Sequence, residues 1–234
     1  MLVDMHLDRP TWAALTRGRA GRPPRPSRRI RWILVTLGSL LIALVLVVAI
    51  GLSSGSDVKT VHGPWRVVFD GEGLVGFDDG TVVLKPRHSA APSETHAALV
   101  VSVDSHGKLD YRLQMRTAEQ FRRPDPNSWE VAWVLWHYTD PQHFYYLALK
   151  PTGWELGKED PAYPGSQRFL ATGLPAYPIG PWYDVEIQQS GPTMSVTVQD
   201  RPLVTFTDEE RPYLEGNVGL YSEDAHAEFR HFAY

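Results

Sequence analysis

Cysteine is absent from the 234-residue sequence. This absence excludes a disulfide framework, thiolate metal sites, a cysteine nucleophile and a lipid-modified N-terminal cysteine. A P-loop, an H-E-x-x-H motif, a zinc knuckle and an N-x-S/T sequon are also missing. The composition of 43% apolar and 21% charged residues excludes a disordered chain, and 8 Trp, 10 Tyr and 8 Phe supply ample ring area for a core. Stability must therefore come from burial of apolar surface.

Charge is distributed unevenly along the chain. The first 31 residues carry eight arginines against two aspartates, whereas the remainder carries 15 basic and 25 acidic residues, a net charge of −10. Nucleic acid binding relies on a positive surface that neutralises phosphates. The acidic remainder therefore argues against nucleic acid as its partner, and the basic N-terminus needs another explanation.

One long apolar run explains the basic N-terminus. Residues 33–50 contain no charge, and Trp32, Gly51 and Leu52 extend the run to roughly the 20 residues that cross a bilayer. Arginines precede the run, so the positive-inside rule places the N-terminus in the cytoplasm. We expect a basic, disordered cytoplasmic tail (1–31), a transmembrane signal-anchor helix (32–52), a linker (53–63) and an extracytoplasmic domain. A cleaved signal peptide is the alternative, but its apolar core is usually shorter, at about 7–15 residues.

Short β-rich segments separated by turn residues fill the rest of the chain. Leu109, Tyr111, Leu113 and Met115 alternate with polar residues, which is typical of a strand with one buried face. We expect a hairpin between Trp65–Asp70 and Thr81–Lys85. The other expected strands are Val131–Tyr138, Phe144–Lys150, Gly153–Lys158, Gln167–Ala171, Trp182–Gln188, Met194–Gln199, Leu203–Phe206, Asn217–Tyr221 and Ala227–Phe232.

This strand pattern predicts an all-β domain at residues 64–234. About a dozen strands without an amphipathic helix are more than an immunoglobulin-like domain contains, since that domain needs only ~100 residues. The prediction is a two-sheet antiparallel jelly-roll sandwich, preceded by the one N-terminal transmembrane helix.

The C-terminal third resembles a known superfamily. Its successive strands follow the pattern W-Y-x-V-x-V, I-x-V-x-V-D-G, G-x-V-G-L and F-x-x-F of concanavalin A-like lectin/glucanase domains, in the segments that start at Trp182, Met194, Gly216 and Phe229. The segments that start at Trp133, Phe144 and Gly153 resemble the laminin-G-like and 3-keto-disaccharide-hydrolase-like branches. The resemblance implies a jelly roll and a carbohydrate-related function, since the superfamily includes lectins, glycosidases, lyases and adhesion modules.

Two departures bear on catalysis. Asp200-Arg201 stands where the pattern has Asp-Gly, and the Glu-x-Asp-x-x-Glu strand that carries catalysis in the superfamily's glucanases is missing. Glucanase activity is therefore not expected.

Sugars stack on aromatic rings while charged and amide groups bind their hydroxyls. If Ala132, Val134 and Trp136 point into the core, alternate residues of the same and neighbouring strands share the opposite, concave surface, where rings would be exposed. The predicted ligand-binding residues are Trp133, His137, Tyr146, Lys150 and Glu155. The alternative is that these rings simply fill the sandwich.

Hydrolysis needs two carboxylates about 5 Å apart for retention or about 6.5–9.5 Å for inversion. Asp184 with Glu186, and Glu155 with Glu159, share strand faces. Glu155 is the weak catalytic candidate, although acidic residues on exposed strand faces are common.

Metal sites are less clearly indicated. His137, Asp140 and His143 lie around one turn but match no familiar spacing. Asp70, Glu72, Asp78 and Asp79 lie in glycine-rich turns and are weak candidates for structural calcium, the one cofactor considered.

The leading hypothesis is a membrane-anchored domain that binds a cell-envelope or environmental glycan without cleaving it. The second is a glycoside hydrolase or lyase that uses Glu155 with His137 and Lys150. The third is a structural or protein-interaction module, with contacts through loops such as Asp160–Ser166.

Overall fold

The computed structural model describes residues 60–91 and 93–234. The predicted tail and transmembrane helix, and residues 53–59 of the predicted linker, lie outside these residues. Within the described part, no helix is long and apolar enough to cross a membrane.

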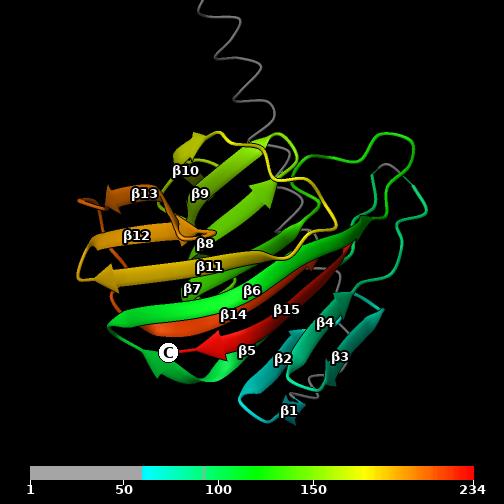
Figure 1. Ribbon diagram of the computed structural model, residues 1–234, viewed down its shortest axis with the longest axis horizontal. Coiled ribbons are helices and arrows are strands. Elements are labelled where there is room, and N and C mark those ends of the chain that lie inside the picture. Colours follow the sequence, from blue (N-terminus) through cyan, green and yellow to red (C-terminus); the bar gives the residue numbers. More distant parts are fainter. Residues whose placement is uncertain (1–59, 92) are drawn as a thin grey trace, which may run out of the picture. The chain divides into compact units, whose positions relative to one another are not determined.

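The described residues form two antiparallel sheets (Figure 1). The eight-stranded sheet has the order β1 (Val61–His62), β2 (Trp65–Phe69), β5 (Ala97–His106), β14 (Gly216–Glu223), β7 (Ala132–Asp140), β8 (His143–Lys150), β9 (Gly153–Glu159) and β10 (Gln167–Gly173). The seven-stranded sheet has the order β13 (Arg201–Thr207), β12 (Thr193–Val198), β11 (Tyr183–Ser190), β6 (Leu109–Gln120), β15 (Ala225–Ala233), β4 (Thr81–Lys85) and β3 (Leu74–Asp78). The predicted all-β, two-sheet antiparallel sandwich is confirmed.

Period-two alternation builds the core between the sheets. Ala132, Val134 and Trp136 of β7 point into it, and the alternating apolar side chains of β6 meet them from the other sheet. In Figure 1, β11, β6 and β15 lie in front of β7 and β14. The predicted direction of these side chains is confirmed, so the opposite face of β7 and β8 is the outer face of the eight-stranded sheet.

Two details of the strand prediction are wrong. The hairpin partner of β4 is β3, joined through Asp79-Gly80, whereas the predicted partner, β2, pairs with β5 in the other sheet. The strands β1, β3 and β5 have no counterpart among the expected strands, and β5 is the longest of the three. Its first six residues are all buried, so both faces are apolar and no alternation marks it.

The turn between β12 and β13 replaces the usual Asp-Gly with other residues. Gln199 and Asp200 have φ angles of 52° and 57°, the left-handed conformation that a two-residue hairpin requires. The departure at Asp200-Arg201 therefore leaves the hairpin intact, with its turn one residue earlier.

Candidate functional site

The outer face of the eight-stranded sheet carries a second apolar cluster. Its buried aromatic residues are Trp133, Tyr138, Phe144, Tyr146 and Tyr221, and Leu99 and Leu135 belong to the same cluster. The rings of Trp133 and Tyr146 stack with centroids 4.5 Å apart, and Tyr221 meets Trp133 edge-on at 5.5 Å. The two sheets account for every strand that the structure describes, so no further described strand covers this face.

The rings on this face are less accessible than the sequence analysis expected. Trp133 is 1% exposed and Tyr146 is fully buried. Tyr146 lies over Gly157 on the neighbouring strand, where an added Cβ would come within 2.1 Å of the phenol ring. The prediction of exposed rings is therefore wrong, because the missing side chain at Gly157 lets Tyr146 lie flat against the sheet.

Three of the predicted ligand-binding residues meet in one hydrogen-bonded group. The Tyr146 hydroxyl donates to Glu155 Oε1 at 2.6 Å, and Lys150 Nζ donates to Glu155 Oε2 at 2.5 Å. Gln167, which the sequence analysis missed, donates from Nε2 to the Tyr146 hydroxyl at 2.9 Å. Burial and the neighbouring Glu155 carboxylate raise the pKa of Tyr146, so its hydroxyl keeps its proton. We call Tyr146, Lys150, Glu155 and Gln167 the Tyr146 cluster.

Glu159 lies beside the Tyr146 cluster on the same face of β9. It is 3% exposed, and its Oε1 has no hydrogen-bond partner among the described residues. Burial raises the pKa of Glu159 to about 8. Gln167 stands opposite Glu159 in the strand register, and its buried Oε1 is also without a partner. Two hydrogen-bond acceptors are thus buried side by side without donors, which is uncommon in folded proteins.

A second acidic group lies on the other side of Trp133. Glu223 accepts a hydrogen bond from the Tyr221 hydroxyl at 2.9 Å and is 2% exposed. Burial, helped by the nearby Asp224 and Glu130, raises the pKa of Glu223 to about 7. The sequence analysis missed Glu223; its place two residues after Tyr221, on the same strand face, is the only signal that could have found it.

His137 does not belong to this face, contrary to the prediction. Its backbone has a φ of 48°, and the pairing of β7 with β8 shifts register between Trp136 and Asp140. This β-bulge reverses the alternation, so His137 turns away from Trp133. Its ring is 2.8 Å from the carbonyl oxygen of Tyr213 and 3.1 Å from that of Gly107. His137 therefore holds two loops together at one end of the sandwich.

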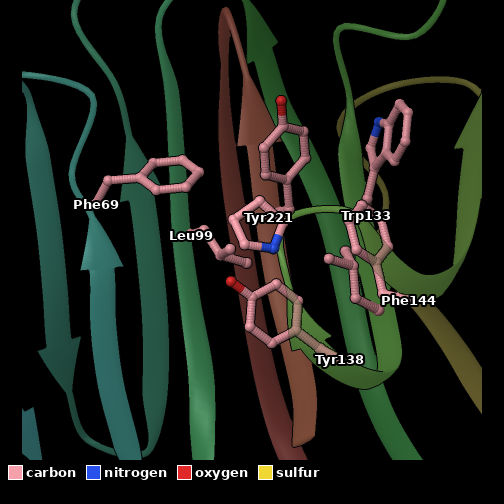
Figure 2. Close-up of a pocket in the computed structure, with 8 residues that line it drawn as sticks. Phe69, Leu99, Trp133, Tyr138, Phe144 and Tyr221 are labelled. Atoms are coloured by element: carbon pink, nitrogen blue, oxygen red, sulfur yellow. The ribbon is translucent and has the colours of Figure 1, made fainter. Parts of the chain in front are cut away.

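The apolar part of the outer face contains a small pocket (Figure 2). Figure 2 shows Phe69 and Leu99 pointing toward Tyr221 and Tyr138. The pocket is lined by Phe69, Leu99, Trp133, Leu135, Tyr138, Pro141, Phe144 and Tyr221. The outer face thus has an apolar region around β5, β14 and β7 and a polar region at β9 and β10.

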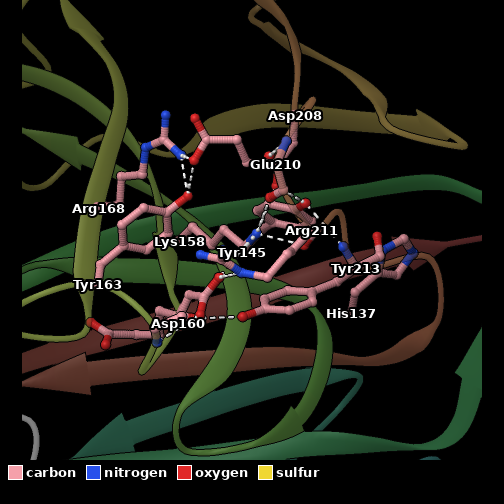
Figure 3. Close-up of polar contacts among 12 residues, drawn as sticks. His137, Tyr145, Lys158, Asp160, Tyr163, Arg168, Asp208, Glu210, Arg211 and Tyr213 are labelled. Carbon is pink, nitrogen blue, oxygen red and sulfur yellow. Dashed lines mark hydrogen bonds and ion pairs between the residues drawn. The ribbon is translucent and has the colours of Figure 1, made fainter.

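A buried ionic network lies at one end of the sandwich (Figure 3). Lys158 is fully buried and donates to Asp208 at 2.8 Å, to the carbonyl oxygen of Arg211 at 2.7 Å and to that of Glu210 at 3.1 Å. Tyr145 also donates to Asp208, at 2.6 Å. Every polar atom of this network is satisfied, so its role is to fix the loop after β13 to the core.

The loop Asp160–Ser166, which the sequence analysis proposed as a contact for a protein partner, packs against the loop after β13 through Tyr163. Tyr163 lies between Arg168 and Arg211, whose guanidinium carbons are 4.8 and 4.9 Å from its ring centroid. Its hydroxyl donates to Glu210 at 2.5 Å. These contacts give the loop a structural role.

The four calcium candidates do not form one site. Asp70 and Glu72 precede β3, whereas Asp78 and Asp79 lie at its other end. Glu72 forms an ion pair with Arg87 at 2.8 Å. At the other candidate site, Asp140 accepts from His143 at 2.8 Å while His137 is turned away. Within residues 60–91 and 93–234, no group of three or more His, Asp or Glu is arranged to hold a metal ion.

The other carboxylate pair, Asp184 and Glu186, lies on the outer face of the seven-stranded sheet. Asp184 accepts from Gln114 at 2.8 Å and Glu186 from Arg112 at 3.1 Å across the strands β11 and β6. Both are therefore engaged in cross-strand contacts typical of a solvated face.

The described residues thus form a concanavalin A-like sandwich. The outer face of its eight-stranded sheet combines aromatic rings, an ion pair and two side-chain oxygens without a described hydrogen-bond partner. Residues 64–233 match the model of the 3-keto-alpha-glucoside-1,2-lyase-like domain, and the chain belongs to this family. No curated protein matches the sequence.

Solved structures share the fold at low sequence identity. A carbohydrate-binding module of Bacillus subtilis, CBM66, is 15% identical with a TM-score of 0.56, and covers 72% of this chain and 93% of that one. A native glycosidic hydrolase is 10% identical with a TM-score of 0.51, and covers 74% and 90%. A Bacillus subtilis protein with a galectin-like fold is 16% identical with a TM-score of 0.50, and covers 78% and 91%. These likenesses support the fold alone.

Proposed function

We propose that the outer face of the eight-stranded sheet binds a cell-envelope or environmental glycan without cleaving it. The observation that carries this proposal is the meeting of Trp133 with the Tyr146 cluster on one sheet face. Rings next to charged and amide groups supply the two kinds of contact that a sugar makes. The fold shared with a carbohydrate-binding module supports the same function.

Binding at this face requires a movement that uncovers the rings. Trp133 and Tyr146 are too buried to stack on a sugar as they stand. Lys150 is the most accessible member of the Tyr146 cluster, with 15% of its side chain exposed. A glycan would therefore meet Lys150 and Glu155 first and reach the rings after the face has opened.

A binding experiment with the purified full-length chain tests the proposal. A glycan array is screened with the native protein, with Lys150→Met and with Arg112→Met as a matched control on the other sheet. The proposal expects at least one glycan to bind, with affinity reduced about tenfold or more by Lys150→Met and unchanged by Arg112→Met. Absence of binding to every glycan, or equal binding by both variants, would contradict it.

The enzyme alternative draws support from one observation. Burial raises the pKa of Glu159 to about 8, which is the condition of a general acid at neutral pH. Glu155, the weak catalytic candidate, is already paired with Lys150 and Tyr146, which favours binding over catalysis. Mass analysis of candidate glycans after incubation separates the two functions: products that disappear with Glu159→Gln would establish catalysis.

Membrane anchoring belongs to the same proposal. The uncharged run at 33–50 and its arginine-rich flank support a single-pass plasma-membrane protein with the domain outside the cytoplasm. Protease treatment of intact cells should remove the domain and leave a protected N-terminal fragment. Recovery of the full chain from the soluble fraction would contradict this topology.

A further inference from the structure

Resting on the proposed function, we propose that the sugar unit held beside Glu159 and Gln167 is an amino sugar with a free ammonium group. The observation behind this proposal is the pair of buried Oε1 atoms, one on each residue, that have no hydrogen-bond partner in the part of the chain that the structure describes. Both residues are buried: Glu159 is 3% exposed and Gln167 is 8% exposed. An unsatisfied buried acceptor is costly, so the pair is suited to a ligand that brings donors.

The neighbouring side chains direct their hydrogen bonds to other acceptors. The Gln167 amide donates to Tyr146, and the hydroxyl of Tyr146 donates to Glu155. Lys150 also donates to Glu155. Among residues 60–91 and 93–234, no side chain donates to Glu159 Oε1, so a ligand can supply this donor.

Charge favours an ammonium over a hydroxyl as that donor. Glu155 is matched by Lys150 at 2.5 Å, whereas Glu159 and Glu223 form no ion pair with any described residue. An ammonium group has three N–H donors and no acceptor, so one group can satisfy both Oε1 atoms and also balance a carboxylate. Burial keeps the Glu159 carboxyl protonated in the free protein, and a bound ammonium stabilises its ionised form, so binding releases that proton and forms an ion pair. A hydroxyl or an acetamido group is neutral and forms no such pair.

The stacked rings of Trp133 and Tyr146 offer an aromatic surface on which the apolar face of the amino sugar can stack. Tyr146 extends from the stacked pair with Trp133 toward β9 and β10, and its hydroxyl lies within hydrogen-bond distance of Glu155 and Gln167. A pyranose on this ring would place a ring substituent toward Gln167 and its neighbour Glu159. The proposal therefore assigns stacking to the rings and recognition of the amino group to Glu159 and Gln167.

Three hexasaccharides that differ only at one ring position test the proposal: β-1,4-linked glucosamine (amino), N-acetylglucosamine (acetamido) and cellohexaose (hydroxyl). Calorimetric titration of the full-length chain should show glucosamine hexamer binding about tenfold or more tightly than the other two. Glu159→Gln, which keeps the shape of the side chain but cannot ionise when the ammonium binds, should abolish that preference and leave cellohexaose affinity unchanged. Gln167→Met is a second variant that should weaken the preference.

Glu186→Gln, on the outer face of the other sheet, is the matched control and should keep the preference in full. Equal affinity for the three hexamers would overturn the amino-sugar inference while leaving glycan binding intact. A preference that survives Glu159→Gln would also overturn it, because general attraction to the acidic domain would then account for the binding. Failure of every glycan on the array to bind would instead contradict the proposed function itself.

Discussion

The outer faces of the two sheets differ in the pairing of their charged side chains and in the burial of their aromatic rings. On the seven-stranded sheet, polar side chains pair across strands, as Arg112 does with Glu186 and Arg116 does with Glu228 at 2.7 Å. Its ring, Trp182, is only half-buried and lies under Arg230, 4.0 Å from the ring centroid. This face has the pairing expected of a surface in water.

The eight-stranded sheet shows the opposite arrangement. Its outer face buries Trp133 and Tyr146 completely or nearly so, and within residues 60–91 and 93–234 no cation pairs with Glu159 or Glu223. Burial of carboxyl groups without a charge partner costs stability, and proteins accept such costs mainly at functional sites. This difference supports the proposed binding site on the eight-stranded sheet.

Removal of a ring should affect the two faces very unequally. Trp133→Ala deletes a buried ring that contacts Tyr146 and Tyr221, and we expect a loss of about 3–5 kcal/mol in the free energy of unfolding. Trp182→Ala removes a half-buried ring and its cation–π contacts, at a cost of about 1 kcal/mol. Urea unfolding measures both values. Similar losses for the two variants would mean that the faces do not differ as described.

The pH dependence of stability should identify the unpaired carboxyls. Folding raises the pKa of Glu159 from 4.5 to about 8, so between these values the folded protein keeps a proton that the unfolded chain loses. Stability should therefore fall as pH rises through this window, by about 1.4 kcal/mol per pH unit for one fully shifted group. Glu223, with a pKa of about 7, should contribute the same sign up to neutral pH.

Variants separate the contribution of Glu159 from that of the other groups. Glu159→Gln should make the decline in stability between pH 5 and pH 8 shallower, because one titrating group is gone. Glu186→Gln, in a partly exposed ion pair, should leave the slope unchanged. Urea unfolding curves at several pH values measure the slopes, and an unaltered slope in Glu159→Gln would show that this carboxyl is not held protonated.

A single hydroxyl gives a smaller test of the same comparison. Tyr146→Phe removes one buried hydrogen bond from Glu155 Oε1 and one from Gln167 Nε2, and we expect a loss of about 1–3 kcal/mol. Tyr183→Phe, on β11 of the other sheet, removes an exposed bond to the carbonyl oxygen of Pro178 and should cost about 0.5 kcal/mol. Thermal or urea unfolding measures both. The account fails here if Tyr183→Phe is the more damaging change.

The smallest effect is expected for the charge pairs of the seven-stranded sheet. Arg112 and Glu186 are 59% and 29% exposed, so a double-mutant cycle to alanine should give a coupling of about 0–1 kcal/mol that decreases in high salt. A strong, salt-independent coupling would show that this face is more than a solvated surface.

The sandwich itself could be predicted because alternation records burial on one face of a strand. Leu109, Tyr111, Leu113 and Met115 alternate with polar residues and face the core as predicted. The strand β5 could not be recognised in this way, because its residues 97–102 are buried on both faces and carry no period. Burial on both faces depends on the rest of the fold, which a local pattern does not contain.

The candidate site was predictable in part, for a similar reason. Tyr146, Lys150 and Glu155 follow from strand alternation alone, and the structure brings them together. The departure of His137 from this face depends on a bulge with positive φ at a non-glycine residue, for which the sequence has no sign. Glu159 and Glu223 looked like ordinary acidic residues near strand ends, because their burial arises only from packing.

The indole N–H signals of Trp133 and Trp182 give the most direct test of the central claim, that the outer face of the eight-stranded sheet binds glycan. Each signal is assigned by a Trp→Phe variant in a ¹H–¹⁵N NMR spectrum of the full-length chain, and a glycan identified on the array is titrated in. The Trp133 signal, whose N–H donates to the carbonyl oxygen of Trp129, should shift in a saturable manner while Trp182 stays unchanged. A shift of Trp182 alone, or no shift of either, would contradict the account.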